Sequence, residues 1–397
     1  ERPMKAANSL LSSYGTTVFE VMSRLAIEHK AINLGQGFPD DRGPDPVLEQ
    51  ASKALYDRPN QYPPMMGVPE LRQAVAAHNK RFYGLDVDWQ KEVMVSTGAT
   101  EGLAACFLGL IEPGDEVVVI EPLYDCYLPM IRRAGGIPRP VRLTPPNWDL
   151  DLDALEAAFS DRTKMIVVND PQNPASKVYS RDELTAIADL CQKYDAYALC
   201  DEAYEHLAFD GRPHIPLMTL DGMRERCVRI GSAGKTFSLT GWKVGYLTAP
   251  EHLLGPISKA HQFLVFTTAP NLQRAVAFGL EQDDAYFDGL RDDMARRRDR
   301  LTDGLTGIGL APVTCQGTYF LFVDVAAHLY DAETDEGFCR RLVTDAGVAA
   351  VPVSAFYLDP LSAPRNYIRF CFAKQDAVLD GAVEKLDTYL KEVGLGI

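Results

Sequence analysis

Short runs of apolar residues, each ended by polar or turn-forming residues, recur along the first two thirds of the chain. Between them lie longer segments, such as 103–111 and 181–194, whose apolar positions repeat every three to four residues. The short runs are typical of buried strands, and the longer segments predict amphipathic helices. Strands that alternate with helices indicate a mostly parallel sheet buried between them. The expected strands are 93–96, 116–120, 165–169, 197–200 and 228–230.

Polar residues are concentrated directly after these expected strands. In open α/β sheets, ligands bind beyond the carboxyl ends of the strands, so these residues are expected to converge on one pocket. No Gly-x-Gly-x-x-Gly pattern follows any of the strands, which argues against a dinucleotide site. The polar stretches are 98–101, 121–127, 169–173, 201–204 and 232–235.

The pattern changes after a charged helix at 291–304. Strands at 317–323, 348–353 and 367–370, with a helix through Phe338, predict a smaller α+β domain. The N-terminal residues up to about 40 are expected to pack against it. We therefore predict a large domain at 41–290 and a small domain made of 1–40 together with 291–397.

Three consecutive arginines stand within that charged helix. Arg296, Arg297 and Arg298 alternate with aspartates at positions 292, 293 and 299. Mixed charges of this kind predict a solvated helix face.

Composition and charge narrow the classes of function. With 397 residues and 46% hydrophobic content, the chain is long enough to bury a large core. Its net charge of -15 argues against binding to the phosphate backbone of nucleic acids. No apolar run approaches the roughly 20 residues of a membrane span, and residues 8–24 lack a signal-peptide pattern. Small-molecule chemistry is favoured.

Cysteines and histidines give no sign of a disulfide framework or a metal. The eight cysteines show no Cys-x-x-Cys spacing, which favours a reducing cytoplasm. The seven histidines lack paired zinc-ligand spacing, and His206 and His214 flank a turn at 211–213. We expect a cytoplasmic protein without a metal.

A lysine on a turn of small residues is the most informative feature. Segment 232–235 reads Ser-Ala-Gly-Lys, and Lys243 follows eight positions after Lys235. A lysine amine in a dry pocket loses its charge readily and forms a Schiff base with a carbonyl. A second cation and the hydroxyl of Ser232 suit a phosphate group. This pattern favours a phosphate-bearing aldehyde, whereas the ordinary alternative is a solvated loop lysine.

Other strand ends carry compatible groups. Asp201 is either a helix cap or a carboxylate beside Lys235, and the phenol of Tyr204 follows three residues later. Asn173 lies in a Pro-Gln-Asn-Pro segment, which is also a plain turn signal. The segment 98–100 opens a helix whose backbone N–H groups suit an anion.

Together these residues resemble the fold-type I, class I aminotransferases, which use pyridoxal 5′-phosphate (PLP). The resemblance covers nearly the whole chain, and 232–245 is its most specific part. It implies an α/β fold with a large domain, whose mostly parallel seven-stranded sheet lies between helices, and a smaller α+β domain. It also implies a homodimer with shared active sites.

The resemblance implies a role for each candidate residue. Lys235, Asp201 and Tyr204 are similar to the catalytic residues: the Schiff-base lysine, the partner of the ring nitrogen, and a ligand of the ring's phenolic oxygen. The other cofactor ligands are Gly98, Ala99, Thr100, Ser232 and Lys243 at the phosphate, Tyr62 of the partner subunit, Tyr124 stacked on the ring, and Asn173. The substrate ligands are Arg369 at the α-carboxylate, Gly37 in a closing loop, Asn173, Thr17 and Phe266.

Within the family, the chain resembles the branch of kynurenine aminotransferases, glutamine transaminase K and cysteine-conjugate β-lyases. Methionine and N-succinyldiaminopimelate aminotransferases are similar too. Thr17 and Thr267 stand where kynurenine enzymes carry tryptophan and histidine, which argues against kynurenine as donor. Asp170 and the pair Ala175-Ser176 also depart from the family pattern, next to Asn173.

We therefore expect an enzyme that moves the α-amino group of an L-amino acid to a 2-oxo acid in two half-reactions. A neutral, sulfur-containing, glutamine or aromatic donor is favoured, since no second arginine matches the one that binds a distal carboxylate. Alternatives are a C–S β-lyase on the same scaffold and an N-succinyldiaminopimelate aminotransferase. A PLP-binding regulator is more remote, because no room for a DNA-binding module precedes Asn33.

Overall fold

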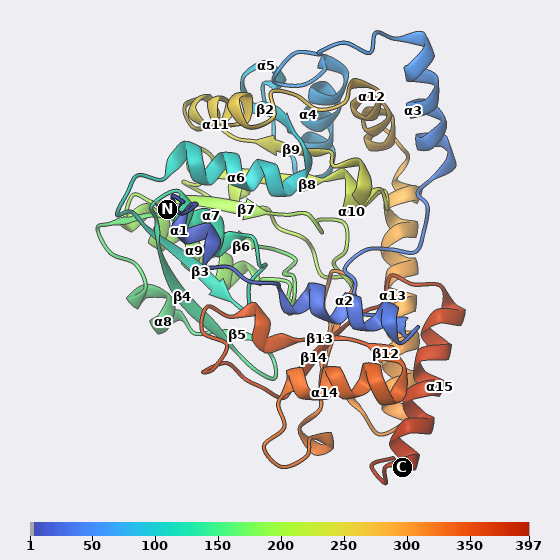
Figure 1. Ribbon diagram of the computed structural model, residues 1–397. Helices are drawn as coiled ribbons and strands as arrows, with labels where there is room; N and C mark the ends of the chain where they lie inside the picture. The colour runs from blue at the N-terminus through green and yellow to red at the C-terminus, as the bar shows by residue number, and fades with distance from the viewer. Residues whose placement is uncertain (1–3, 397) are drawn as a thin grey trace.

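A large sheet crosses the middle of the computed structural model, which describes residues 4–396 (Figure 1). Five neighbouring strands, β8, β7, β6, β3 and β4, run parallel, whereas β9 is antiparallel to both β8 and β2. This arrangement confirms the mostly parallel sheet. The order is β2 (Val93–Ser96), β9 (Gly245–Thr248), β8 (Cys227–Ser232), β7 (Tyr197–Asp201), β6 (Thr163–Asn169), β3 (Glu116–Glu121), β4 (Ile137–Thr144) and β5 (Asp149–Leu150).

Three of these eight strands were not among the five read from the pattern. Strand β4 contains Pro138 and Pro140, and β9 begins at a glycine, so neither has the composition of a buried strand. Strand β5 has only two residues and pairs with the outer edge of β4. Seven longer strands therefore form the expected sheet, and β5 extends it.

Helices cover both faces of the sheet because its strand residues alternate between two cores. Val118 and Ile166 face a core that includes Leu184 of α9, whereas Val117 and Met165 face a second core with α6. The helices around the sheet are α3 (Asp45–Asp57), α4 (Pro69–Tyr83), α5 (Trp89–Glu92), α6 (Gly98–Leu110), α7 (Tyr127–Arg133), α8 (Leu152–Ala157), α9 (Arg181–Lys193), α10 (Ala233–Thr236), α11 (Glu251–Leu264) and α12 (Pro270–Leu280).

A smaller antiparallel sheet lies in the lower part of Figure 1, beside the long helix α13. Its order is β10 (Ala311–Pro312), β11 (Phe320–Asp324), β14 (Tyr367–Cys371) and β13 (Val351–Pro352). The helices of this part are α13 (Asp284–Gly307), α14 (Asp335–Arg341) and α15 (Asp376–Glu392), and the N-terminal segment contributes α1 (Ser9–Ser12), α2 (Val18–Glu28) and β1 (Ile32–Asn33).

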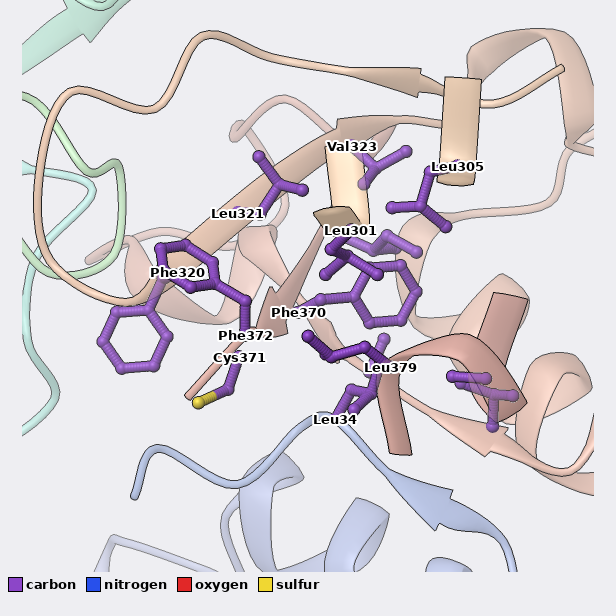
Figure 2. Close-up of a cluster of buried hydrophobic side chains, with 14 of the residues drawn as sticks. Leu34, Leu301, Leu305, Phe320, Leu321, Val323, Phe370, Cys371, Phe372 and Leu379 are labelled. Carbon is purple, nitrogen blue, oxygen red and sulfur yellow. The ribbon is translucent and has the colours of Figure 1, made fainter. Parts of the chain in front are cut away.

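The N-terminal segment packs against this smaller sheet, as expected. Strand β1 pairs with β12 (Val348–Ala349), and the backbone N–H of Cys371 donates to the carbonyl of Leu34. Figure 2 shows Leu34 in one buried cluster with Phe370 and Leu301. The domain boundaries at 41–290, 1–40 and 291–397 stay a prediction, and residues 1–3 and 397 lie outside the described part of the chain.

Two local expectations are wrong. The single strand expected at 348–353 is two short strands, because β12 pairs with β1 whereas β13 pairs with β14. The arginine-rich stretch is not a solvated face, since only Arg296 is exposed and Arg297 and Arg298 are 7% and 8% exposed.

Their burial is balanced by partners from other elements. Arg297 pairs with Asp41 at 3.1 Å, and Arg298 pairs with Asp210 at 2.8 Å. A buried guanidinium is tolerated when it is paired and hydrogen-bonded.

No helix within residues 4–396 is both long and apolar enough to cross a membrane.

Candidate active site

A cavity lies at the carboxyl edge of the large sheet, where ligands bind in open α/β folds. Residues from five strand ends line it, as the polar stretches of the sequence predict. The predicted cofactor ligands in its wall are Gly98, Ala99, Thr100, Tyr124, Asn173, Asp201, Tyr204, Ser232, Lys235 and Lys243. It is also lined by Leu103, Asn169, Ala203, Gly234, Thr240 and Val244.

Lys235 lies on α10, a single helical turn that begins directly after β8. Its amine donates to the hydroxyl of Tyr319 at 3.1 Å and to the carbonyl of Gly37 at 3.3 Å. Burial lowers the pKa of Lys235 to about 8, and the positive charges of Arg369 and Lys243 act in the same direction. A useful fraction of the amine is therefore neutral, and nucleophilic, near neutral pH.

Asp201 ends β7 and is 5% exposed. One carboxylate oxygen accepts a hydrogen bond from the hydroxyl of Tyr127 at 2.5 Å, and the other accepts from the backbone N–H of Ala203 at 3.3 Å. Residues 203–206 form a turn, so Asp201 is not a helix cap. Burial raises its pKa, although the bonds from Tyr127 and Ala203 oppose that shift. This carboxylate is suited to a buried cationic N–H.

An anion cradle lies where α6 begins. Gly98 has a φ of +78°, and a Cβ built on it would lie 2.8 Å from the amine nitrogen of Lys243. Lys243 itself has a φ of +54°, a conformation that only Gly adopts freely. Within residues 4–396 its amine has no hydrogen bond or ion pair, so a positive charge and the N–H groups of a helix N-terminus face the cavity together.

Arg369 approaches the cavity from the smaller sheet, on β14. Its guanidinium donates to Asn173 Oδ1 at 2.9 Å and to the carbonyl of Gly35 at 3.3 Å, and it lies between the rings of Phe320 and Phe356. The residue is 5% exposed, and its Nε has no hydrogen-bond partner. No carboxylate oxygen of the described residues lies within 4.0 Å, so this buried cation is suited to an anionic ligand.

Other predicted ligands lie outside the cavity wall. Gly37 contacts Lys235 through its carbonyl, as described above. Tyr62 is 83% exposed and packs edge-on against Phe266, with ring centroids 5.4 Å apart. Thr17 is exposed and caps α2 by accepting from the N–H of Glu20. Roles for Tyr62, Phe266 and Thr17 therefore stay predictions, and those of Tyr62 and Phe266 depend on a second subunit.

Three residues of the site carried no role in the sequence analysis. Tyr127 binds Asp201, Tyr319 binds both Lys235 and Gly37, and Asn169 joins the carbonyl of Asp201 to the backbone N–H of residue 173. Tyr127 and Asn169 stand within the polar strand-end stretches, which was a usable signal. Tyr319 stands at the start of an apolar strand, where nothing local distinguishes it from a core residue.

Hydrogen bonds fix the loop that carries Asn173, although some of its residues depart from the family pattern. Ser176 adopts a φ of +58°, and its hydroxyl donates to the carbonyl of Phe320 at 2.6 Å. Ala175 is buried, and Asp170 accepts from the N–H of Tyr179. Burial raises the pKa of Asp170 to about 7. These bonds tie the loop to the start of β11 and so position Asn173 against Arg369.

The groups that face this cavity fit PLP. An unpaired lysine above a helix N-terminus suits its phosphate, the amine of Lys235 suits its aldehyde, and Asp201 suits its protonated ring nitrogen. Gly98 permits this cradle, since any larger residue would place its Cβ against Lys243.

Known proteins are similar to this chain in both sequence and fold. The profile of the family described as "Aminotransferase class I and II" matches residues 29–386. The methionine aminotransferase of Escherichia coli is 39% identical over 95% of this chain and 97% of its own length. Human kynurenine–oxoglutarate transaminase 1 is 38% identical over 93% of this chain and 95% of its own length.

Solved structures agree with this picture. N-succinyldiaminopimelate aminotransferase from Mycobacterium tuberculosis superposes with a TM-score of 0.92 at 43% identity, covering 97% of this chain and 100% of that one. An Escherichia coli structure with a methionine aminotransferase function superposes with a TM-score of 0.93 at 38% identity, with the same coverage.

Proposed function

This chain belongs to the class I and II aminotransferases, and from that premise we propose that its amino donor is a neutral L-amino acid. It is a PLP-dependent enzyme that acts on amino acid and 2-oxo acid substrates. Its relatives are named as enzymes, which disfavours the remote alternative of a regulator. The open questions are the donor and the role of each residue.

The charge balance around Arg369 carries the proposal. This guanidinium is buried and unpaired among the described residues, and its planar fork suits the two oxygens of an α-carboxylate. The described residues that line the cavity include no arginine, and Arg369 lies next to this wall, where it donates to Asn173. The charge of Asp125 interacts with that of Arg369, so Asp125 repels a second carboxylate on a substrate bound at Arg369. A neutral side chain therefore fits better than an acidic one.

PLP, when bound, supplies an electron-withdrawing ring that stabilises the negative charge left on the substrate α-carbon. In this proposal Arg369 holds the α-carboxylate and so fixes the orientation of the α-carbon. Lys235 Nζ acts as a general base when it removes the α-proton of the donor. In the second half-reaction it acts as a general acid and returns a proton to the α-carbon of the product. Asp201, held by Tyr127, would keep the ring nitrogen protonated, and Tyr204 and Asn173 would hold the phenolic oxygen.

We also propose a homodimer with shared active sites. Tyr62 and Phe266 are exposed in the single chain, and Phe263, Leu264 and Val265 are exposed beside Phe266. A contiguous apolar surface of this kind is typical of an interface. The homodimer proposal fails if isolated monomer at low concentration keeps full cofactor affinity and activity.

The eight free cysteines support a location in the reducing cytoplasm.

The donor is tested with purified holoenzyme and pyruvate, a 2-oxo acid that has no second carboxylate. Initial rates are measured with L-methionine, L-glutamine, L-phenylalanine and N-succinyl-LL-diaminopimelate. We expect at least one neutral donor to exceed N-succinyl-LL-diaminopimelate in kcat/KM by about tenfold or more, the value of one lost charged contact. A preference for the succinylated donor would overturn the proposal and support the activity for which the Mycobacterium tuberculosis relative is named.

The same preparation distinguishes the β-lyase alternative. Removal of the α-proton is common to both reactions, which diverge only when a β-substituent leaves. Release of pyruvate and ammonia from β-chloroalanine, without an oxo acid, reports the elimination. Elimination faster than transamination of every donor would reassign the main activity.

A further inference from the structure

Three side chains that the mechanism does not use converge behind the turn after β7. Glu205 and His206 follow Tyr204 on this turn, and His78 lies on α4, 128 positions before His206. None of the three lines the cavity of the active site. The sequence spacing of the histidines predicted no metal, but this cluster exists only in the folded chain.

The ligand atoms of the three side chains form a small triangle. His78 Nε2 lies 2.8 Å from His206 Nε2 and 3.1 Å from Glu205 Oε1, and His206 Nε2 lies 3.3 Å from the same oxygen. Ligands of a tetrahedral Zn²⁺, at about 2.0–2.2 Å from the metal, are separated by about 3.4 Å. Each edge of the triangle is therefore within about 0.6 Å of the separation that Zn²⁺ requires. Small side-chain rotations would complete the geometry.

Hydrogen bonding alone does not satisfy this triangle. A neutral imidazole carries one N–H, and an ionised carboxylate carries none, so facing lone pairs remain when the two histidines share one proton. Glu205 Oε1 has no hydrogen-bond partner, although Glu205 is 6% exposed. A cation at the centre would use all three lone pairs at once.

The surroundings fix the orientation of Glu205. Arg229 holds the other oxygen of Glu205 at 3.5 Å and pairs with Glu202 at 2.5 Å, so two carboxylates share one guanidinium. His214 Nε2 forms a hydrogen bond with Glu202 Oε1, the carboxylate oxygen that Arg229 leaves free. Phe287 packs on the ring of His206, with centroids 4.5 Å apart. Partners that orient a ligand from outside in this way are typical of metal sites.

We propose that His78, Glu205 and His206 bind one divalent transition-metal ion, Zn²⁺ by preference, with water as the fourth ligand. Two imidazoles and one carboxylate are a ligand set that Zn²⁺ accepts readily. The ion links α4 to the turn that carries Tyr204, just after the strand that ends at Asp201, and so it stabilises one wall of the active site without entering it. This proposal does not rest on the identity of the amino donor.

The test uses untagged holoenzyme that has been treated with a chelator and dialysed. Equilibrium dialysis against ZnCl₂ measures bound metal, and CoCl₂ is used in parallel because a bound Co²⁺ ion reports its geometry by visible absorption. The variants are His78→Gln and Glu205→Gln, with His252→Gln as a control, since His252 is an exposed histidine outside the cluster. Circular dichroism and cofactor absorbance check that each variant is folded.

We expect one equivalent of Zn²⁺ per wild-type chain and a tetrahedral Co²⁺ spectrum. Affinity falls at least about tenfold in His78→Gln and Glu205→Gln and is unchanged in His252→Gln. The melting temperature of the wild type rises by about 2–5 °C with Zn²⁺ at 100 times its Kd. Failure of the wild type to bind, or equal binding by His78→Gln, would overturn the proposal and leave a hydrogen-bonded cluster. If one variant misfolds, the stoichiometry and the Co²⁺ spectrum of the wild type still decide.

Discussion

The two halves of the active site are built in different ways. The half that faces the proposed cofactor comes from strand ends of one sheet, and each of its groups lies within a few residues of a buried strand. The half that faces the proposed substrate lies next to the cavity wall, where Gly37 and Tyr319 contact Lys235 and Arg369 contacts Asn173. These residues come from the N-terminal segment and from the region of the smaller sheet. Lys235 touches both halves. In the proposed assignment, the chemistry depends on groups of one sheet, whereas donor choice depends on how separate segments meet.

Removal of the group that joins the halves gives the largest expected effect. Lys235→Ala is expected to lower kcat by about 10⁴-fold or more, because the other lysine in the described cavity wall, Lys243, has its amine at the anion cradle beside Gly98. Transamination of the best donor is measured by oxo-acid product, with the exposed Lys193→Ala as a control. Turnover near the wild-type level would disprove the central role of Lys235.

A change confined to the cofactor half follows. Asp201→Asn keeps the shape of the side chain but removes the charge that faces the ring nitrogen. We expect kcat to fall by about 10²–10³-fold, with weaker cofactor retention and little change in KM. Cofactor content is read from the visible spectrum after dialysis. A pure rise in KM would place Asp201 in the substrate half instead.

A change confined to the substrate half is expected to do the opposite. Arg369→Lys keeps a positive charge but loses the fork and the bond to Asn173. We expect kcat/KM to fall by about 10–100-fold, chiefly through KM, while cofactor content is unchanged. Loss of cofactor in this variant would mean that the halves are not separable.

The pKa of Lys235 predicts how the enzyme stripped of cofactor takes it up again. Only the neutral amine attacks an aldehyde, and a pKa lowered to about 8 makes the neutral form dominant above that pH. The uptake rate is expected to rise about tenfold between pH 7 and pH 9 and then to level off. The rate is followed by stopped-flow absorbance at fixed PLP. A continued rise above pH 9 would show an ordinary lysine pKa.

The smallest expected effect lies at the boundary between the halves. Tyr319→Phe removes the hydroxyl that binds Lys235 and the carbonyl of Gly37 but keeps the ring. One such hydrogen bond corresponds to about a 2–10-fold change in kcat. Tyr357→Phe is a control, because its buried hydroxyl lacks a partner among the described residues. Equal effects of both substitutions would argue against a specific role for Tyr319.

Much of the fold was predictable because it depends on local pattern. Alternating apolar runs and helical periodicity reveal the parallel sheet, and polar residues after each run reveal its functional edge. The sequence pattern did not predict strands β4 and β9, because proline and glycine interrupt the apolar runs. Both segments nevertheless pair with neighbouring strands of the sheet. The motif around Lys235 was informative for the same reason, since its residues lie next to one another in the chain.

The amino-acid sequence by itself determined the fold class, the sheet edge that forms the site, and the groups that suit an aldehyde and a phosphate. These properties follow from neighbours in the chain, which any conformation keeps together. Only the tertiary structure decided that Tyr319 contacts Lys235, that Arg297 and Arg298 are buried, and that His78 meets His206. Each of these contacts joins residues from separate elements, and their pairing depends on packing and charge balance over the whole fold, which no local pattern records.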